Sequence, residues 1–399
     1  MEFRRINGLP PYVFAIINRL TAESRRAGND VVDLGFGNPD IPSPEVAVEK
    51  LAEAARNPRN HRYSSSIGIP KLRLAISDLY LRRFGVQIDP DTEVVTTIGA
   101  KEGLSHLMWV LLGPGDTALV PSPSYPIHIY APLFAGADVR QVRLIGQGDG
   151  GQEAGGEAFF GHLVETWEST WPKPRVIVLS FPHNPTTTCV ELAWMTRLVH
   201  FAAERDVILV HDFAYSETAF DGYVPPSILE VPGAKDVAVE LYTLTKSFSM
   251  AGWRMAFMVG NAEIVAALAK LKSYLDYGAF QPIQIASIVA MNEAAEYPKV
   301  VNEIYEGRRN TLCEGLARIG WDVPKPRGTM FVWAPIPEPY AELGSLEFSK
   351  QLVAEANVST SPGVGFGPGG DDHVRFALVE NEQRIAQAVR NLRRALPKL

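Results

Sequence analysis

The sequence predicts an α/β fold built on a mostly parallel sheet, for two reasons. From about residue 70 onward, short apolar runs rich in β-branched residues alternate with stretches of helical periodicity. The stretches between successive runs are also long enough for the crossovers that parallel strands need. Apolar residues make up 46% of the 399 residues and charged residues 21%, which is ordinary globular usage and indicates an ordered chain with a sizeable core.

The elements of this fold follow one another in a regular order. Six apolar runs are the expected strands, over residues 94–98, 117–120, 176–180, 207–210, 237–244 and 255–259. Apolar residues spaced at i, i+3 and i+4 predict helices between them, over residues 103–112, 192–204 and 263–275.

The last hundred or so residues predict a separate α+β layer. A long helical stretch over 283–316 precedes two expected strands, 328–334 and 373–378. The residues before Pro44 have few regular periods, and we expect them to pack beside this layer. The segment 146–156 has six glycines in eleven residues and predicts a flexible surface excursion with no assigned function.

Charge and composition exclude several classes of protein. A formal net charge of −7 argues against a nucleic-acid binder, which needs a basic face to neutralise phosphates. No run approaches the roughly 18 apolar residues of a membrane span, and the first residues lack the apolar core of a signal peptide. Cys189 and Cys313 match no metal or redox spacing, which fits a reducing compartment. We therefore expect a soluble, cytoplasmic protein.

Several common site motifs are absent or out of context. The string Gly365–Gly370 satisfies G-x-G-x-x-G, but it precedes an expected strand instead of opening a helix, so it predicts a turn and not a dinucleotide site. The eight histidines show no metal-ligand spacing, so no metal site is expected. A Walker A loop and a G-x-S-x-G elbow are also missing.

The most informative segment is Thr243–Ala256. Lys246 lies just past an apolar strand and is flanked by hydroxyl side chains, and Arg254 follows eight residues later. In isolation this pattern would indicate a surface loop with two solvated cations. However, the run resembles the pyridoxal-phosphate lysine signature of the class I/II aminotransferases, with Thr243 where the family usually has Ser.

Other motifs extend the resemblance over nearly the whole chain, in the family's order. Thr187 departs from the pattern, because the family usually has Gly at that position. The matching segments are Tyr63 with Gly68, Leu72 and Arg73, then Gly99-Ala100-Lys101, Asn184-Pro185-Thr186, Asp212-Phe213-Ala214-Tyr215, and Arg375 in the expected strand 373–378.

The resemblance implies fold type I of the pyridoxal 5'-phosphate enzymes: a large domain with a mostly parallel seven-stranded sheet, and a smaller α+β domain. The implied boundaries are residues 1–45 for an N-terminal arm and part of the small domain, 46–285 for the large cofactor domain, and 286–399 for the small domain. Tyr63 in such enzymes reaches the phosphate of the neighbouring subunit, which implies a homodimer with shared active sites.

The resemblance also assigns roles to the residues that do the chemistry. Lys246 would form a Schiff base with the cofactor aldehyde and, once displaced by the substrate amine, would move the α-proton. Asp212 would keep the pyridine nitrogen protonated, so that the ring can accept electrons. Tyr215 and Asn184 would donate hydrogen bonds to the ring oxygen.

Further residues would hold the phosphate, the ring and the substrate. Tyr125 would stack on the ring, and Arg375 would bind the substrate α-carboxylate through its planar fork. Gly37 would lie over the same carboxylate, where a side chain would block entry. The phosphate group would be bound at a helix N-terminus and by nearby hydroxyls and charge, from Gly99, Ala100, Lys101, Thr243, Thr245 and Arg254.

Sequence detail narrows the resemblance further, to bacterial glutamate-pyruvate (alanine) aminotransferases. These would move an amino group from L-alanine to 2-oxoglutarate in two half-reactions. LL-diaminopimelate aminotransferases are the alternative, and a lyase or decarboxylating synthase could use the same lysine and aspartate. A cofactor-sensing regulator would need a DNA-binding extension and a basic patch, and the net charge of −7 argues against this alternative. The segments that carry the narrower resemblance are 97–103, 121–130, 272–278 and 361–367.

Overall fold

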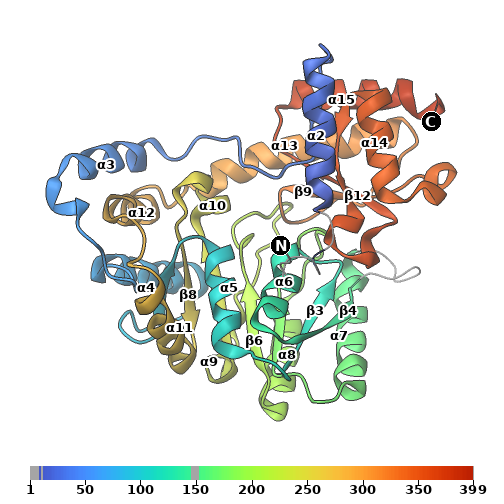
Figure 1. The fold of residues 1–399 in the computed structure, drawn as a ribbon. Coiled ribbons are helices and arrows are strands. Elements are labelled where there is room, and N and C mark those ends of the chain that lie inside the picture. Colours follow the sequence, from blue (N-terminus) through green and yellow to red (C-terminus); the bar gives the residue numbers. More distant parts are fainter. Residues whose placement is uncertain (1–8, 10–11, 145–151, 399) are drawn as a thin grey trace, which may run out of the picture.

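The computed structural model describes residue 9, residues 12–144 and residues 152–398. Its centre is a seven-stranded sheet of order β2-β8-β7-β6-β5-β3-β4 (Figure 1). Only β8 runs antiparallel to its neighbours β2 and β7, so the prediction of a mostly parallel seven-stranded sheet is confirmed. In sheet order the strands are β2 (Val94–Thr97), β8 (Ala256–Gly260), β7 (Ala238–Thr243), β6 (Ile208–Asp212), β5 (Val176–Leu179), β3 (Thr117–Ser122) and β4 (Asp138–Arg143).

The bounds of the six predicted strands agree with the observed bounds to within two residues. Strand β4, however, was not predicted from the sequence. This strand is at the edge of the sheet and pairs only with β3. Its sequence is mostly charged or polar, and Val142 is its one buried residue. Charged edge strands avoid pairing with other chains, and for the same reason they lack the apolar run by which a strand is recognised.

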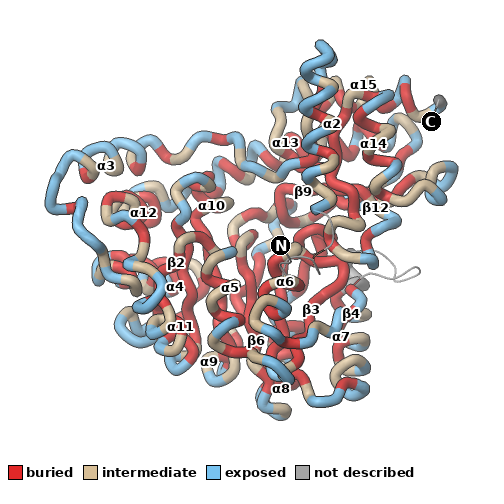
Figure 2. The backbone as a smooth tube through the Cα atoms, in the orientation of Figure 1, coloured by how far each residue is buried: buried red, intermediate tan, exposed pale blue. Residues whose placement is uncertain are grey.

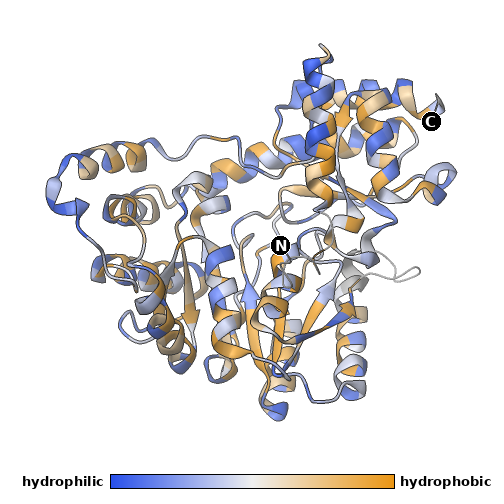
Figure 3. Cartoon of the chain, viewed as in Figure 1, coloured by the Kyte–Doolittle hydropathy of each residue, from blue (hydrophilic) through white to orange (hydrophobic). Residues whose placement is uncertain are grey.

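Helices cover both faces of this sheet because side chains alternate along each strand. On β5, Val176 and Val178 join one core cluster with α5, α6 and α11, whereas Ile177 and Leu179 join a second with α4, α7 and α8. Apart from β4, the strands are accordingly buried along their length, and most of their residues are hydrophobic (Figures 2 and 3). These helices are α4 (Pro70–Phe84), α5 (Ala100–Leu111), α6 (Pro126–Ala135), α7 (Gln152–Ser169), α8 (Leu192–Arg205) and α11 (Ala262–Leu275).

Part of the predicted glycine-rich excursion is a helix. Residues 145–151 lie outside the described residues, but α7 begins at Gln152 and takes in the end of the segment. The Trp194 indole donates a 2.7 Å hydrogen bond to the carbonyl of Gly156, which is buried. A Cβ on Gly156 would lie 3.2 Å from Val190. The prediction of a flexible excursion is therefore wrong where α7 begins, and Gly156 permits close packing there.

A second layer is built on small sheets and has its own core (Figure 1). An antiparallel sheet has the order β11-β12-β9, and β1 pairs in parallel with β10. The latter pairing joins the N-terminal segment to the C-terminal residues. The elements are β1 (Val32–Asp33), β9 (Phe331–Pro335), β10 (Val358–Ser359), β11 (Ser361–Pro362), β12 (His373–Ala377), α2 (Val13–Arg26), α13 (Tyr297–Arg318), α14 (Gly344–Ala356) and α15 (Glu382–Ala395).

The helices of this region differ from the sequence prediction in two ways. The helical stretch 283–316 is broken into α12 (Gln281–Glu293) and α13, and Pro298 in the first turn of α13 accounts for the break because proline favours that position. Helix α2 was not predicted. Its sequence does carry a helical pattern, because Phe14, Ile17, Leu20 and Thr21 recur at helical spacing and Ile17 and Thr21 are buried, so the prediction overlooked it.

The remaining elements are short or lie at the periphery. None of the helices in the described ranges is long and apolar enough to cross a membrane. The string Gly365–Gly370 falls in two 3₁₀ turns that precede β12, so the turn prediction is confirmed. The remaining helices are α3 (Glu45–Arg56), α9 (Ala234–Val237), α10 (Leu244–Ser247), and the 3₁₀ helices η1 (Pro58–His61), η2 (Ile228–Glu230), η3 (Ala251–Trp253), η4 (Glu338–Leu343), η5 (Gly363–Phe366), η6 (Pro368–Gly370) and η7 (Leu396–Lys398).

Candidate active site

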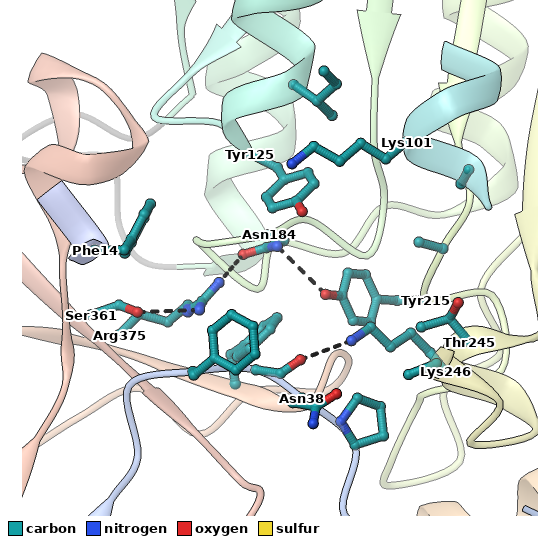
Figure 4. A pocket seen from close by; sticks show the side chains of 18 of the residues that line it. Phe14, Asn38, Lys101, Tyr125, Asn184, Tyr215, Thr245, Lys246, Ser361 and Arg375 are labelled. Carbon is teal, nitrogen blue, oxygen red and sulfur yellow. Dashed lines mark hydrogen bonds between the residues drawn. The ribbon is translucent and has the colours of Figure 1, made fainter. Parts of the chain in front are cut away.

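A cavity of about 390 Å³ lies where the carboxyl ends of the parallel strands meet the second layer (Figure 4). This edge of a parallel sheet is where α/β proteins generally place their sites. Most of the residues singled out from the sequence line it, namely Gly37, Ala100, Lys101, Tyr125, Asn184, Asp212, Tyr215, Thr243, Thr245, Lys246, Arg254 and Arg375. Gly99 and Tyr63 are not among the lining residues.

A chain of buried hydrogen bonds joins β5, β6 and β7. Asn184, Asp212 and Lys246 lie at or just past the carboxyl ends of these three strands. Glu240 on β7 is fully buried and accepts a 2.8 Å hydrogen bond from Nδ1 of His211 on β6. Nε2 of His211 in turn accepts from the backbone N–H of Phe181, just past β5. This arrangement places the ring proton on Nδ1 and ties β5, β6 and β7 together beneath the cavity.

Lys246 lies in the short helix α10, directly after β7. Its Nζ donates a 2.9 Å hydrogen bond to the carbonyl of Gly37, from the N-terminal segment (Figure 4). Burial, together with the positive charges of Arg375 and Arg254, lowers the pKa of Lys246 to about 7. A large fraction of the amine is therefore neutral at physiological pH, as a nucleophile or a general base requires.

This lowered pKa sets the pH dependence of the reaction of Lys246 with an aldehyde. We expect the rate at which Lys246 bonds covalently to an added aldehyde, such as the pyridoxal phosphate that the sequence resemblance implies, to rise about tenfold per pH unit below 7, because only the neutral amine reacts. The rate should level off above about pH 7. Stopped-flow absorbance measures it, and a rate that still climbs at the same slope at pH 9 would contradict the assignment.

Asp212 is the last residue of β6 and is buried. One carboxylate oxygen, Oδ2, is 2.8 Å from Nε2 of His128, and Nδ1 of His128 is 2.9 Å from the Ser124 hydroxyl. The other oxygen, Oδ1, has no hydrogen-bond partner within the described part of the protein. An unpartnered buried carboxylate oxygen beside the cavity suits a ligand that brings its own N–H donor.

Asn184 links two other predicted residues (Figure 4). Its Oδ1 accepts a 2.7 Å hydrogen bond from Arg375, and its Nδ2 lies 3.5 Å from the Tyr215 hydroxyl. Burial raises the pKa of Tyr215 well above its ordinary value, so the phenol stays protonated and can donate a hydrogen bond. The acidic residues nearest to Arg375 along the chain, Asp371 and Asp372, do not pair with it. Asp371 binds Ser345, and Asp372 binds His373.

The turn after Asn184 is strained at Thr187, the position where the sequence departs from the aminotransferase pattern. Thr187 has φ of 60°, in the left-handed region that glycine adopts freely and a β-branched residue rarely does. Hydroxyl contacts of Thr186 with His183 and Thr188, both 2.8 Å, hold the surrounding turn. Thr187 therefore adopts a backbone conformation that glycine also allows, so the turn that carries Asn184 keeps its shape.

One end of the cavity is suited to an anion. The backbone N–H groups of Ala100 and Lys101 open helix α5, whose N-terminus carries partial positive charge. Gly99, with φ of 81°, caps this helix, and a Cβ there would collide with the Arg254 guanidinium. The hydroxyls of Thr243 and Thr245 lie 2.9 Å apart on the same side. Because Gly99 has no side chain, the Arg254 guanidinium can lie close to the N-terminus of α5.

Gly37 and Tyr125, two more of the predicted residues, also line the cavity. A Cβ on Gly37 would lie 2.6 Å from the Phe331 ring and 3.7 Å from Arg375, so only glycine fits there. Tyr125 is half-buried at the start of α6, and the Lys101 ammonium lies 5.9 Å from the centre of its ring.

Tyr63 lies outside the cavity of its own chain. Its side chain is 84% exposed, and its ring packs 4.4 Å from that of Tyr277. Its predicted contact with the phosphate of a neighbouring subunit stays a prediction.

Glu102, His106 and Asp276 bring potential metal ligands within 4.8 Å of one another, away from this cavity. The buried Lys272 ammonium lies 3.2 Å from Glu102 and 2.9 Å from Asp276, so a cation already balances these carboxylates. That the protein binds no metal stays a prediction.

Sequence reasoning missed several residues of this cavity. His128, Phe331 and Phe366 line it, as do Tyr12 and Phe14 at the start of α2. His128 could have been suspected, since it lies one helical turn beyond Tyr125 on the same helix face. The aromatic residues come from distant segments and carry no local pattern.

Comparisons with known proteins give one consistent result. The sequence model of a family described as aminotransferase class I and II matches residues 29–392. The chain is 51% identical to the glutamate-pyruvate aminotransferase AlaC of Escherichia coli over 98% of this chain and 93% of that protein. It is 39% identical to an LL-diaminopimelate aminotransferase of Desulforudis audaxviator, over 100% of this chain and 99% of that protein. The substrate-bound structure of BacF from Bacillus subtilis has a TM-score of 0.89 and 34% identity, covering 99% and 97% of the two chains.

Proposed function

Because the chain belongs to the class I and II aminotransferases, whose cofactor is pyridoxal phosphate, we propose that it transfers an amino group between L-alanine and 2-oxoglutarate. The observation that carries the proposal is one cavity in which Lys246, Asp212 and Arg375 converge. The preference for alanine is supported by the higher identity to the glutamate-pyruvate enzyme than to the LL-diaminopimelate enzyme.

The side chains of the cavity fit the cofactor. The unpartnered Oδ1 of Asp212 can accept from a protonated ring nitrogen, and the N-terminus of α5 with Arg254 can bind a phosphate. We infer that these groups hold the cofactor together with Gly99, Ala100, Lys101, Thr243 and Thr245. Tyr125 would cover the ring. The bound cofactor supplies a ring that accepts the electrons released when the substrate α-proton leaves.

The protein side chains then do three things. Lys246, a large fraction of which is neutral near pH 7, would take the α-proton at Nζ and hold it for return to carbon. Asp212 would offer its carboxylate to the ring nitrogen, and His128 orients that carboxylate. Tyr215 and Asn184 would donate hydrogen bonds to the ring oxygen.

Arg375 and Gly37 orient the substrate. The Arg375 fork would bind the α-carboxylate bidentately, which fixes the direction of the Cα–H bond relative to Lys246. Only glycine fits at position 37, beside the Arg375 fork, because a Cβ there would lie 2.6 Å from the Phe331 ring and 3.7 Å from Arg375.

The experiment that tests the substrate compares two amino donors. L-alanine presents only a methyl group, whereas LL-diaminopimelate ends in a second charged amino-carboxylate that must be paired when buried. We expect kcat/KM with 2-oxoglutarate as acceptor to be higher for L-alanine than for LL-diaminopimelate. A coupled assay at equal donor concentrations measures it. Faster transfer from LL-diaminopimelate would favour the alternative enzyme, and activity with neither donor would leave only the family assignment.

We also propose that the protein works as a cytoplasmic homodimer with shared active sites. Tyr63 and three other exposed aromatic side chains lie together in sequence or space, a pattern typical of a surface covered by a partner. Their exposed fractions are 84% for Tyr63, 84% for Tyr274, 60% for Tyr277 and 47% for Phe280. Tyr63 would reach the phosphate in the partner's cavity. Within each subunit, we propose that residues 46–285 form the large domain and that residues 1–45 and 286–399 form the arm and the small domain.

Shared sites predict complementation between two damaged variants. Tyr63→Phe and Lys246→Ala dimers, each impaired, should regain activity when mixed under conditions that let subunits exchange. One of the two sites in each hybrid would then have both intact residues. Activity is followed during mixing, with sedimentation as a check on dimer exchange. Full activity in a monomer would contradict shared sites.

A further inference from the structure

The environment of the Arg375 guanidinium is unusual for a buried cation. All the acceptors of its hydrogen bonds are uncharged: Asn184 Oδ1 at 2.7 Å, Ser361 Oγ at 3.2 Å and the Gly35 carbonyl at 3.3 Å. Arg375 is only 6% exposed, and its Nε has no partner within the described residues. Burial lowers the pKa of Arg375 to about 10, so the group is still charged at neutral pH. A buried charge ordinarily needs an acidic partner.

Two phenyl rings lie against this guanidinium instead. The Cζ atom of Arg375 is 3.9 Å from the centre of the Phe331 ring and 4.6 Å from that of Phe366. Both rings are almost completely buried, so water does not screen their contact with the cation. The negative face of an aromatic ring attracts a guanidinium, most strongly when both are desolvated.

Neighbouring side chains fix the orientation of the two rings. Phe14 at the start of α2 meets Phe366 edge to face at 5.0 Å, and Trp333 meets it at 6.0 Å. Gly365 leaves space for Phe14, since a Cβ there would lie 2.8 Å from that ring. Phe331 is held by Tyr215, whose ring centre is 5.7 Å away. Neither ring can turn away from Arg375 without disturbing these contacts.

We propose that Phe331 and Phe366 are positioning residues for the substrate carboxylate, because their ring faces hold the Arg375 guanidinium in place of an acidic partner. An aspartate in that role would orient the arginine equally well, but it would neutralise the charge and compete with the incoming carboxylate. Rings and neutral acceptors orient the fork and leave its charge for the substrate. This inference rests on the proposed function only through the role of Arg375.

The experiment measures carboxylate binding apart from catalysis. Propionate, which has a carboxylate but no amino group to transfer, is titrated calorimetrically into the holoenzyme. Three variants are compared with the unsubstituted protein: Phe366→Leu, Phe331→Leu and Arg375→Met. Phe348→Leu is the matched control, because Phe348 is a fully buried phenylalanine of the same core cluster as Phe331 and packs on Trp321 and Tyr340. The visible spectrum reports retained cofactor in each.

We expect Phe366→Leu and Phe331→Leu each to weaken propionate binding roughly tenfold, and Phe348→Leu to leave it unchanged. KM for L-alanine should rise by a similar factor while kcat changes by less than about twofold, since the lost interaction is present in ground state and transition state alike. Propionate binding in Phe366→Leu that equals binding in Phe348→Leu would overturn the inference. Unchanged binding in Arg375→Met would instead refute the role of Arg375 on which the proposed function depends.

Discussion

Replacing Lys246 with alanine should reduce transamination by about 10²–10⁴-fold or more, because the protein loses both its nucleophile and the base that moves the α-proton. The cofactor should still bind, although more loosely and without a covalent bond. The helix N-terminus, the threonine hydroxyls and Arg254 that would hold the phosphate are untouched by the substitution. Turnover with L-alanine and 2-oxoglutarate, measured at saturating cofactor, tests this expectation.

Lys270→Ala is the matched control for that variant. Lys270 is an exposed residue of α11, and neither α11 nor its flanks line the cavity. The control should retain full activity. If Lys246→Ala kept activity within a few-fold of the control, another group would have to be the base.

Replacing Asp212 with asparagine should lower turnover by about 10²–10³-fold, in the range found when a preorganised electrostatic partner is removed. Asparagine keeps the size of the side chain and can still contact His128, so the fold should be preserved. It lacks the negative charge that stabilises a protonated ring nitrogen, and the electron-accepting power of the cofactor falls with it.

Asp206→Asn provides the comparison for Asp212→Asn. It makes the same chemical change on an exposed residue just before β6, and Asp206 has φ of 54°, which asparagine accepts readily. We expect normal turnover and an unchanged melting temperature for this variant. Near-normal turnover of Asp212→Asn would remove Asp212 from the mechanism.

The central sheet was predictable because its strands are buried on both faces. The six recognised strands are nearly continuous apolar or β-branched runs, interrupted by a charge only at Glu240 in β7, and this is the pattern that parallel strands leave in a sequence. Strand β4 was not predicted because Val142 is its only buried residue, so the strand has no apolar run. The helix at the end of the glycine-rich segment was not predicted for a different reason. Trp194, 38 residues further along the chain than Gly156, donates a hydrogen bond to the first turns of that helix, and local composition carries no record of that contact.

The residues of the site also divide into those that could be predicted from the sequence and those that could not. Lys246, Asp212, Asn184 and Arg375 belong to local motifs in a fixed order, so their convergence could be expected before the structure was known. His128 and the phenyl rings on Arg375 act through contacts between remote segments. For instance, Phe366 and Phe14 meet across almost the full length of the chain. Such contacts arise from the packing of the second layer on the sheet and have no signature in sequence spacing.

The central claim is that the amine of Lys246 is the group in this cavity that bonds to the cofactor. The most direct measurement is reduction of the yellow holoenzyme with borohydride, which makes that bond permanent, followed by peptide mapping. The account predicts one labelled peptide, with the cofactor on Lys246. Label on any other lysine, or a holoenzyme that carries no label after reduction, would contradict it.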